Sequence, residues 1–229
     1  VRRLATAPPV RVLSTSTDGA LDVTQLSWGP GYGPATHAWL IHPTGIDPTT
    51  LPGVLALHAH GGVRSVGAEV LVEDGETSVR AQQIRQAHYE GLAPANDLAA
   101  RGFTVLVHDA FSWGSRRLTL TSSQANDGAG RVRPDGTYER AAPANAEAYD
   151  EEMRVFEPRL ASWASLLGSS LAGLVAGEDL VALDVLAQYS NGWLGAFGLS
   201  GGGARTVYLS ALDPRLSAVT VCCSLTTWA

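Results

Sequence analysis

The sequence is poor in cysteine, methionine and charged residues, and these scarcities exclude several classes of protein. Two of its 229 residues are cysteines and one is methionine, and all 16 basic residues are arginine, which we attribute to GC-rich codons. The net charge is −6 and no basic run is present, so we expect no nucleic-acid partner. No apolar stretch approaches the ~20 residues that span a bilayer, and no signal-peptide core follows Val1, so we expect no membrane partner.

The two cysteines are neighbours, Cys222 and Cys223, in an apolar pattern typical of a strand. Successive strand residues point to opposite faces, so a disulfide between them is not expected. We interpret them as two small buried side chains rather than a redox or metal pair. Their scarcity favours a reducing, cytoplasmic location. A secreted protein whose signal has been removed stays an alternative, because the chain begins with Val rather than Met.

The length and composition suit one globular domain over residues 1–229, with 45% hydrophobic and 17% charged residues. Short apolar runs of the kind found in buried strands alternate with helical patterns. This alternation predicts an α/β fold, with a mostly parallel sheet and helices on both faces. The predicted buried strands are 53–58, 103–107, 193–197 and 216–222.

The N-terminal part has a different pattern. Residues 11–17 and 21–28, joined by Asp18-Gly19, predict an antiparallel hairpin, and residues 36–42 predict a further strand. Residues 121–158 begin with a stretch rich in Gly, Pro, Asn and Asp and without periodicity, so we expect an insertion or a lid there. The region 160–188 is expected to be mostly helical, with a break at Gly168 or Gly173.

The most informative stretch is Gly198-Leu199-Ser200-Gly201-Gly202-Gly203, which lies between a predicted strand and a predicted helix. In that context the pattern G-x-S-x-G is typical of a nucleophile elbow, a tight turn that presents a serine above the sheet. The backbone N–H of Gly201 would then point toward a developing oxyanion at a helix N-terminus. The alternative is a glycine-rich turn that only packs strand against helix.

A second motif, His58-Ala59-His60-Gly61-Gly62, follows a buried strand, where α/β sheets place their sites. We interpret it as the loop that supplies the second oxyanion N–H, from His60, Gly61 or Gly62. A purely structural loop is one alternative. A metal site is another, but no carboxylate or cysteine lies nearby in the sequence to complete a ligand set.

A third motif runs from His108-Asp109 to Gly114-Ser115-Arg116 after the next strand. Asp109 and Arg116 could form an ion pair that fixes this loop, which we favour over a role as substrate contacts. We expect His108 to be a hydrogen-bonded strand-end residue rather than a base.

The order of these motifs resembles the α/β-hydrolase superfamily, and within it the bacterial acetyl-xylan-esterase-like and dienelactone-hydrolase-like enzymes. The resemblance covers residues 36–229 and includes Glu178-Asp179-Leu180 on a predicted helix. It implies a carboxylic ester hydrolase that needs no cofactor and no metal and acts on a small-molecule ester. Ser200 matches the family nucleophile and Gly201 one oxyanion donor. His60 matches the other donor, although Ala59 stands where the family has glycine, so Gly61 or Gly62 is the alternative.

The chain departs from this family after the elbow, because the family order is serine, acid, histidine. Only 29 residues follow Ser200, and they contain one Asp, no Glu and no His. Asp213, beside Pro214, reads as a turn residue. We therefore expect a part of a longer hydrolase, lacking its last strands. The edge at 216–222 would be covered by a missing segment, a second chain or another copy. A prolyl-oligopeptidase-like peptidase and a non-catalytic fragment with an interaction role are the alternative functions.

Overall fold

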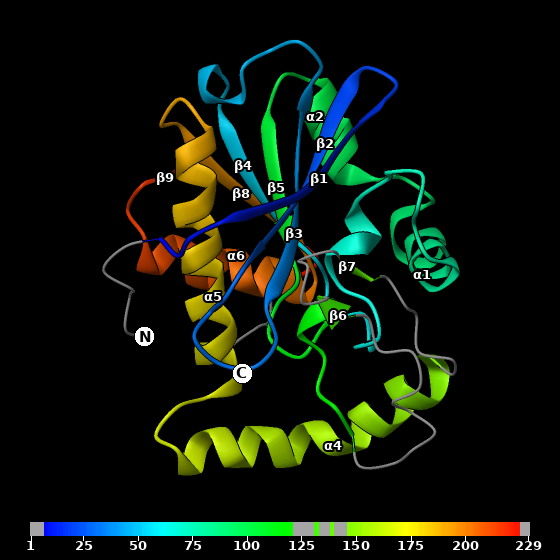
Figure 1. Cartoon of the computed structure of the whole chain (residues 1–229). Coiled ribbons are helices and arrows are strands. Elements are labelled where there is room, and N and C mark those ends of the chain that lie inside the picture. The colour runs from blue at the N-terminus through cyan, green and yellow to red at the C-terminus, as the bar shows by residue number, and fades with distance from the viewer. Residues whose placement is uncertain (1–6, 121–130, 133–137, 140–145, 225–229) are drawn as a thin grey trace.

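The computed structural model describes residues 7–120, 131–132, 138–139 and 146–224, in which a seven-stranded sheet lies between helices (Figure 1). The strand order is β1-β2-β3-β5-β4-β8-β9. The strands of this sheet are β1 (Arg11–Asp18), β2 (Leu21–Trp28), β3 (Thr36–Pro43), β4 (Gly53–Leu57), β5 (Thr104–His108), β8 (Leu194–Leu199) and β9 (Leu216–Cys222). A separate ladder pairs β6 (Arg131–Val132) with β7 (Tyr138–Glu139). The helices are α1 (Val79–Tyr89), α2 (Pro94–Ala100), α4 (Ala146–Leu166), α5 (Leu171–Leu186) and α6 (Gly201–Leu212), with short 3₁₀ helices η1 (Pro48–Thr50), η2 (Ala68–Leu71), η3 (Gly114–Arg116) and η4 (Ala187–Tyr189).

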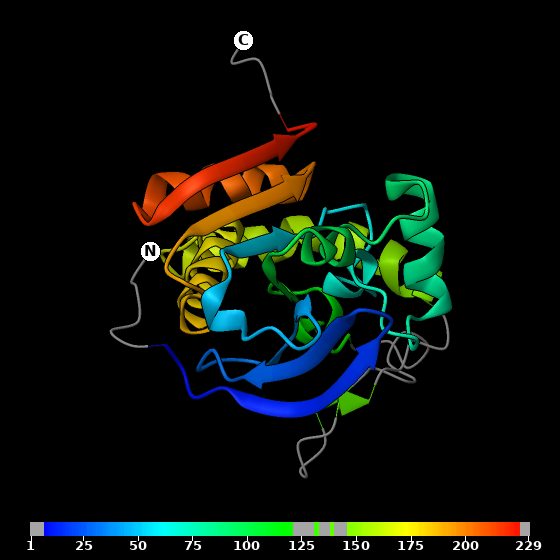
Figure 2. The same ribbon diagram turned by 90° about the horizontal axis from the view of Figure 1, so that it is seen from above.

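The sheet is mixed, with a parallel half and an antiparallel half. Strands β5, β4, β8 and β9 pair parallel with one another, whereas the pairs β1–β2, β2–β3 and β3–β5 are antiparallel. Figure 2 shows the strands following one another across the molecule from β9 to β1. The predicted hairpin is confirmed, and Gly19 in its turn has a φ of +58°. The antiparallel part is larger than that hairpin, because β3 continues it to β5.

Each face of the sheet has its own apolar core, which explains the continuous apolar runs in the sequence. Val54 and Ala56 of β4 pack with residues of α1, α2 and η2 on one face. Leu55 and Leu57 of the same strand pack with residues of α5 and α6 on the other. Side chains alternate between faces along a strand, so a strand covered on both sides is apolar at every position. The expectation of helices on both faces is confirmed.

Helices α4 and α5 are separated by a short break. The predicted break is confirmed at Gly168, where φ is +75°, while Gly173 lies within α5. Residues 146–158 of the expected insertion or lid belong to α4, and most of the rest of that segment lies outside the described residues. No single described helix is long and apolar enough to cross a membrane. The pair α4 and α5, bent by 81° at the break, meets the length and composition test only when taken together.

Two local features differ from the sequence-based expectations. The sequence pattern does not predict helix α1, because its buried residues are Ala81, Arg85 and Tyr89, and these form no apolar stripe. Cys222 is partly exposed and Cys223 is exposed, so the expectation of two buried side chains is wrong. The cause is their position at the end of β9, which is the last strand of the described sheet. Both cysteines are free thiols, as expected.

Candidate active site

Ser200 lies in a strained turn between β8 and α6. Its φ of +54° and ψ of −116° are rare for a residue with a side chain and cost on the order of 1–3 kcal/mol. The turn leaves no room at the flanking glycines, because a Cβ on Gly198 would collide with the backbone of Gly202, and one on Gly202 with the carbonyl of Leu57. The Ser200 N–H donates to the carbonyl of Cys222 at 2.8 Å, so β9 helps to hold the turn. This strand–turn–helix geometry is the one that the G-x-S-x-G pattern predicts.

The first turn of α6 lies directly against the loop that follows β4. A Cβ on Gly201 would lie 2.8 Å from the backbone nitrogen of His60, so only glycine permits this approach. The N–H of Gly201 belongs to the first turn of α6, whose leading N–H groups have no partner within the helix. The structure therefore brings Ser200, Gly201 and the His60 backbone together. In the same loop Gly61 and Gly62 have φ values of +62° and +68°, which suit glycine.

The side chain of His60 is engaged on both ring nitrogens. Its Nδ1 accepts the N–H of Gly62 at 3.1 Å, and its Nε2 lies 3.1 Å from a carboxylate oxygen of Glu157 on α4. This pattern places the proton on Nε2, which donates to Glu157. His60 is therefore occupied as a loop anchor and is not poised to take a proton from Ser200. The contribution it can make to an oxyanion comes from its backbone N–H.

Helix α4 contacts the loop after β4 through the carboxylates of Asp150 and Glu157, which lie two turns apart on one face of the helix. Asp150 accepts the backbone N–H groups of Arg64 and Ser65, both at 2.8 Å. Glu157 forms an ion pair with Arg64 at 2.6 Å in addition to its bond with His60. Hydrogen bonds from His60 and Arg64, aided by the arginine charge, lower the pKa of Glu157 to about 2 against the opposing effect of burial. The part of the expected insertion that the structure describes thus supports the loop after β4.

A pH-dependent loss of stability follows from the lowered pKa of Glu157. Because the pKa in the folded protein lies below the ordinary 4.5, the ionised carboxylate stabilises the fold above pH 4.5. That contribution is lost as the pH falls from 4.5 toward about 2. We expect Glu157→Gln to lower the melting temperature at pH 7, with the difference from the unmodified protein shrinking below pH 4.5. Thermal unfolding followed by circular dichroism across this range measures it.

The matched control is Glu147→Gln, an exposed carboxylate on the same helix that lies 3.6 Å from Arg80. It should change the melting temperature little at any pH. A difference between Glu157→Gln and the unmodified protein that stays constant from pH 7 to pH 3 would show that the ion pair is not the cause.

Arg205 connects α6 to the loop that follows β4. Its guanidinium donates to the carbonyl of His58 at 3.2 Å and to both carboxylate oxygens of Asp179 on α5. Burial acts to raise the pKa of Asp179, but the charge of Arg205 and the hydrogen bonds from His108 and Arg205 outweigh it and hold that pKa below its ordinary value. Burial, followed by the charge of Arg205, holds the pKa of His58 well below 6.5, so His58 is neutral at pH 7.

His108 is a hydrogen-bonded strand-end residue, as expected. Its Nε2 lies 3.0 Å from Asp179, and its Nδ1 lies 3.2 Å from the carbonyl of Asp109. No hydrogen bond joins Ser200 to a histidine side chain in the described part of the chain, and His58, His60 and His108 each have other partners. Asp213 ends α6 and pairs with Arg215 at 2.6 Å, in the turn position expected for it.

Asp109 and Arg116 do not form the ion pair considered for them, because their side chains fix different loops. The Asp109 carboxylate accepts the backbone N–H groups of Ala68 and Ser115, both at 2.8 Å. Arg116 instead pairs with Glu178 of α5 at 2.6 Å. Both residues are buried, and neither lines the cavity beside Gly201. No cluster of three or more His, Cys, Asp or Glu able to hold a metal occurs among the described residues.

The strand order, the helices on both faces and the elbow between β8 and α6 define the α/β-hydrolase fold, as predicted. No protein-family model and no curated protein matches the sequence, so the likeness is structural. A proposed acetyl xylan esterase from Bacteroides fragilis NCTC 9343 superposes with a TM-score of 0.67 at 14% identity, over 93% of this chain and 47% of that one.

Two further esterase structures are similar at lower scores. Acetyl Xylan Esterase 1 from Thermoanaerobacterium sp. JW/SL YS485 has a TM-score of 0.51 at 13% identity, over 93% of this chain and 52% of that chain. A glucuronoyl esterase from Solibacter usitatus has a TM-score of 0.53 at 11% identity, over 96% of this chain and 53% of that chain. The chain thus spans about half the length of the solved structures that it resembles, and the likeness shows the fold.

Proposed function

We propose that Ser200 is the nucleophile of a carboxylic ester hydrolase that acts on acetyl or other small acyl esters through an acyl-enzyme. The observation that carries this proposal is the strained turn at Ser200, with a φ of +54°, which lies next to the backbone amides of Gly201 and His60. Strained backbone conformations of this kind cluster at functional sites, where the surrounding structure holds them in place. The esterases among the similar structures support the same class of reaction.

The proposed reaction is acyl transfer in two steps. The Ser200 oxygen attacks the ester carbonyl carbon while a base takes its proton, and the N–H groups of Gly201 and His60 stabilise the resulting oxyanion. The carbonyl re-forms as the bond to the alcohol breaks, and the alcohol leaves with that proton. Water then attacks the acyl-serine in the same way, which releases a carboxylic acid and restores the serine.

We propose that the base in this scheme comes from outside the 229 residues. No histidine follows Ser200 in the sequence, and His58, His60 and His108 are held by other partners. We propose that a continuation of the same polypeptide or a second chain supplies the base. The coverage of about half of the similar structures supports this arrangement.

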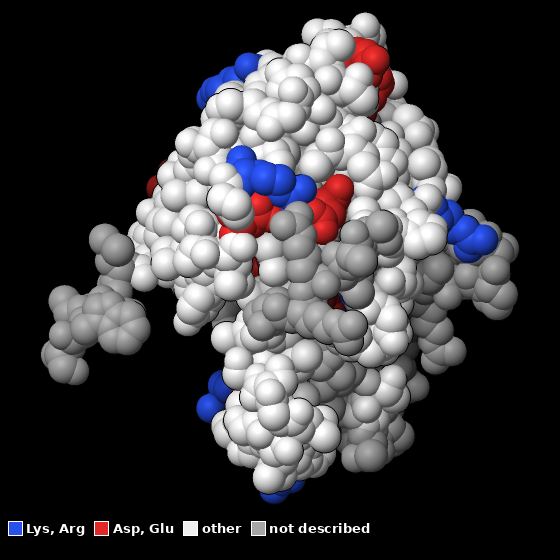
Figure 3. All heavy atoms as spheres, turned by 90° about the vertical axis from the view of Figure 1, so that its left-hand side faces the viewer, with Lys and Arg blue, Asp and Glu red and all other residues white. Residues whose placement is uncertain are grey.

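Strand β9 also supports the presence of further polypeptide. It is the last strand of the described sheet, and its middle residues Ser217–Thr220 are exposed. Figure 3 shows the face on the side of β9 and α5, where most surface atoms belong to uncharged residues. An edge strand of this kind presents unpaired backbone groups to any segment that can add to the sheet.

An ester assay and a peptide assay on the same sample test the proposed function. We expect turnover of p-nitrophenyl acetate, and no cleavage of peptide p-nitroanilides, by a protein that intact mass spectrometry shows to be heavier than the 229-residue chain or accompanied by a second chain. This turnover should disappear in Ser200→Ala. Peptide cleavage, or ester turnover that survives Ser200→Ala, would overturn the proposal.

A further inference from the structure

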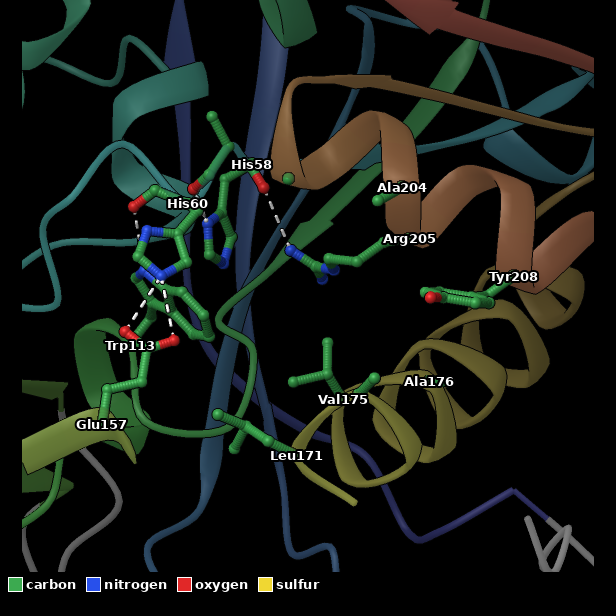
Figure 4. A pocket seen from close by; sticks show the side chains of 13 residues that line it. His58, His60, Trp113, Glu157, Leu171, Val175, Ala176, Ala204, Arg205 and Tyr208 are labelled. Atoms are coloured by element: carbon green, nitrogen blue, oxygen red, sulfur yellow. Dashed lines mark hydrogen bonds and ion pairs between the residues drawn. The ribbon is translucent and has the colours of Figure 1, made fainter. Parts of the chain in front are cut away.

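A cavity of about 220 Å³ lies between the N-terminal halves of α5 and α6 (Figure 4). Its inner end is formed by Gly201 and by the loop residues His58, Ala59 and His60. Figure 4 shows His60, Trp113 and Glu157 on one side of it and Tyr208 on the opposite side. The cavity therefore begins at the two backbone amides proposed to hold the oxyanion and extends away from them along α6.

The side walls of this cavity are apolar, and small residues in them leave the space between the two helices unfilled. Gly201, Ala204 and Tyr208 follow one another along one face of α6, over roughly 10 Å at 1.5 Å per residue. Opposite them, α5 contributes Leu171, Ala172, Val175 and Ala176. Three of these lining residues are alanines, and larger side chains at the same positions would fill the space.

The charged groups around the cavity are paired with one another. Glu157 is neutralised by Arg64 at 2.6 Å, and Arg205 is held by Asp179 at 2.6 Å. The Arg64 guanidinium also stacks on the Trp113 ring, 3.4 Å from its centroid. A charged ligand would find no counter-charge here that is not already engaged, so the walls favour a neutral, apolar group.

The volume sets the size of that group. A dry cavity of about 150 Å³ lined by apolar side chains is large enough to bind benzene. The cavity between α5 and α6 is larger, at about 220 Å³. It therefore has room for an aromatic ring or a medium-length alkyl chain. An acetyl group would leave most of it empty.

We infer that this cavity binds the acyl group of the substrate and that, among the small acyl esters of the proposed function, it favours an aromatic or medium-length acyl group over acetyl. This inference rests on the proposed function, since it places the ester carbonyl at Gly201 and His60. The acyl group is assigned in preference to the alcohol because the alcohol must leave first, whereas the acyl group stays attached through the second step. A cavity between two helices suits the acyl group, because that group remains bound through both steps.

Neutral amides test the cavity without any reaction, since they present a carbonyl and the same acyl group. We expect hexanamide to bind roughly 10²-fold more tightly than acetamide, because each of four further buried methylenes contributes about fourfold. Titration followed by the backbone NMR signals of residues in α5 and α6 gives both dissociation constants. Hexanamide binding no tighter than acetamide would overturn the inference.

Substitutions on one helix locate the binding. Ala204→Leu fills the cavity and should remove most of the preference for hexanamide. Ala211→Leu changes an exposed alanine of the same helix and should leave it intact. The melting temperatures of both variants confirm that they fold. An unchanged hexanamide affinity in a folded Ala204→Leu protein would show that the amide binds elsewhere.

Two further arms separate this inference from the proposed function. Ser200→Ala should bind hexanamide as tightly as the unmodified protein, because Ser200 does not line the cavity. Hexanamide binding in Ser200→Ala, together with ester turnover that survives Ser200→Ala, would leave the cavity assigned and the proposed reaction wrong. Ethyl hexanoate and hexyl acetate have the same composition, so faster acylation by hexyl acetate would place the alcohol in the cavity and contradict the acyl assignment.

Discussion

Acetylation of the 229-residue chain by p-nitrophenyl acetate is expected to place one acetyl group on Ser200, and the acetylation at this position is expected to be lost in Ser200→Ala. The two backbone amides at Gly201 and His60 can still stabilise the oxyanion when no base is present. In serine hydrolases that lack a triad residue, such groups leave roughly 10³–10⁴-fold acceleration over water. Hydrolysis of the acetyl-serine needs a base as well, so the acetylated chain should accumulate. Intact mass and peptide mapping measure the stoichiometry and the position.

Added imidazole is expected to accelerate this acetylation by supplying the missing base. The rate with imidazole must be compared with that of Ser200→Ala at the same concentration, since imidazole also reacts with the ester in solution. The sequence has no lysine, so no side-chain amine competes for the acetyl group. The exposed thiol of Cys223 can also be acetylated, so peptide mapping must separate the two positions. Ser210→Ala, on the exposed face of α6, is the matched control and should be acetylated normally. Equal acetylation of the unmodified chain and Ser200→Ala would refute a nucleophilic role for Ser200.

The sequence predicted those parts of the fold that depend on local pattern. The buried strands β4, β5 and β8 are apolar at nearly every position because both faces of the sheet are covered, and short apolar runs carry that information. The elbow was predictable because its steric demands fall on Gly198 and Gly202, next to Ser200 in the sequence. Roles for Ser200, Gly201 and His60 stay predictions, although the structure brings the three together.

The parts that could not be predicted depend on pairs far apart in the chain. Glu157 meets His60 across 97 residues, and Asp150 meets Arg64 across 86. Both carboxylates lie on a helix of which about half of the other residues are exposed, so nothing local distinguishes them from solvated surface charges. A spacing of seven residues, which places two carboxylates on one helix face, is the one signal that could have suggested a shared target.

The ion pair considered for Asp109 and Arg116 shows the opposite error, because nearness in the sequence suggested a contact that the fold does not make. The backbone between them forms a tight turn at Gly114, where a Cβ would collide with the Asp109 carboxylate. That carboxylate is consequently surrounded by backbone N–H groups, while Arg116 reaches Glu178 on α5. Partners from other elements satisfy each charge better than the local neighbour.

The buried pair of Asp179 and Arg205 is expected to give the largest loss of stability from a single isosteric substitution. Asp179→Asn keeps the shape of the side chain but leaves the guanidinium, which is 8% exposed, without its counter-ion. Removing one partner of a buried ion pair typically costs about 3–5 kcal/mol. We expect a reduction of that size in the free energy of unfolding, measured by urea denaturation. The control is Glu151→Gln, which breaks the exposed pair with Arg154 on α4 and should have a much smaller effect.

The same network has a second consequence, because Arg205 also holds the carbonyl of His58, two residues before His60. Asp179→Leu combined with Arg205→Met should recover part of the lost stability, since no charge is then left unpaired, although His108 loses its acceptor. The loop after β4 would still lack its tie to α6. We therefore expect the double variant to fold but to be acetylated at Ser200 more slowly than the unmodified chain. Normal acetylation in the folded double variant would show that Arg205 stabilises the protein without positioning the loop.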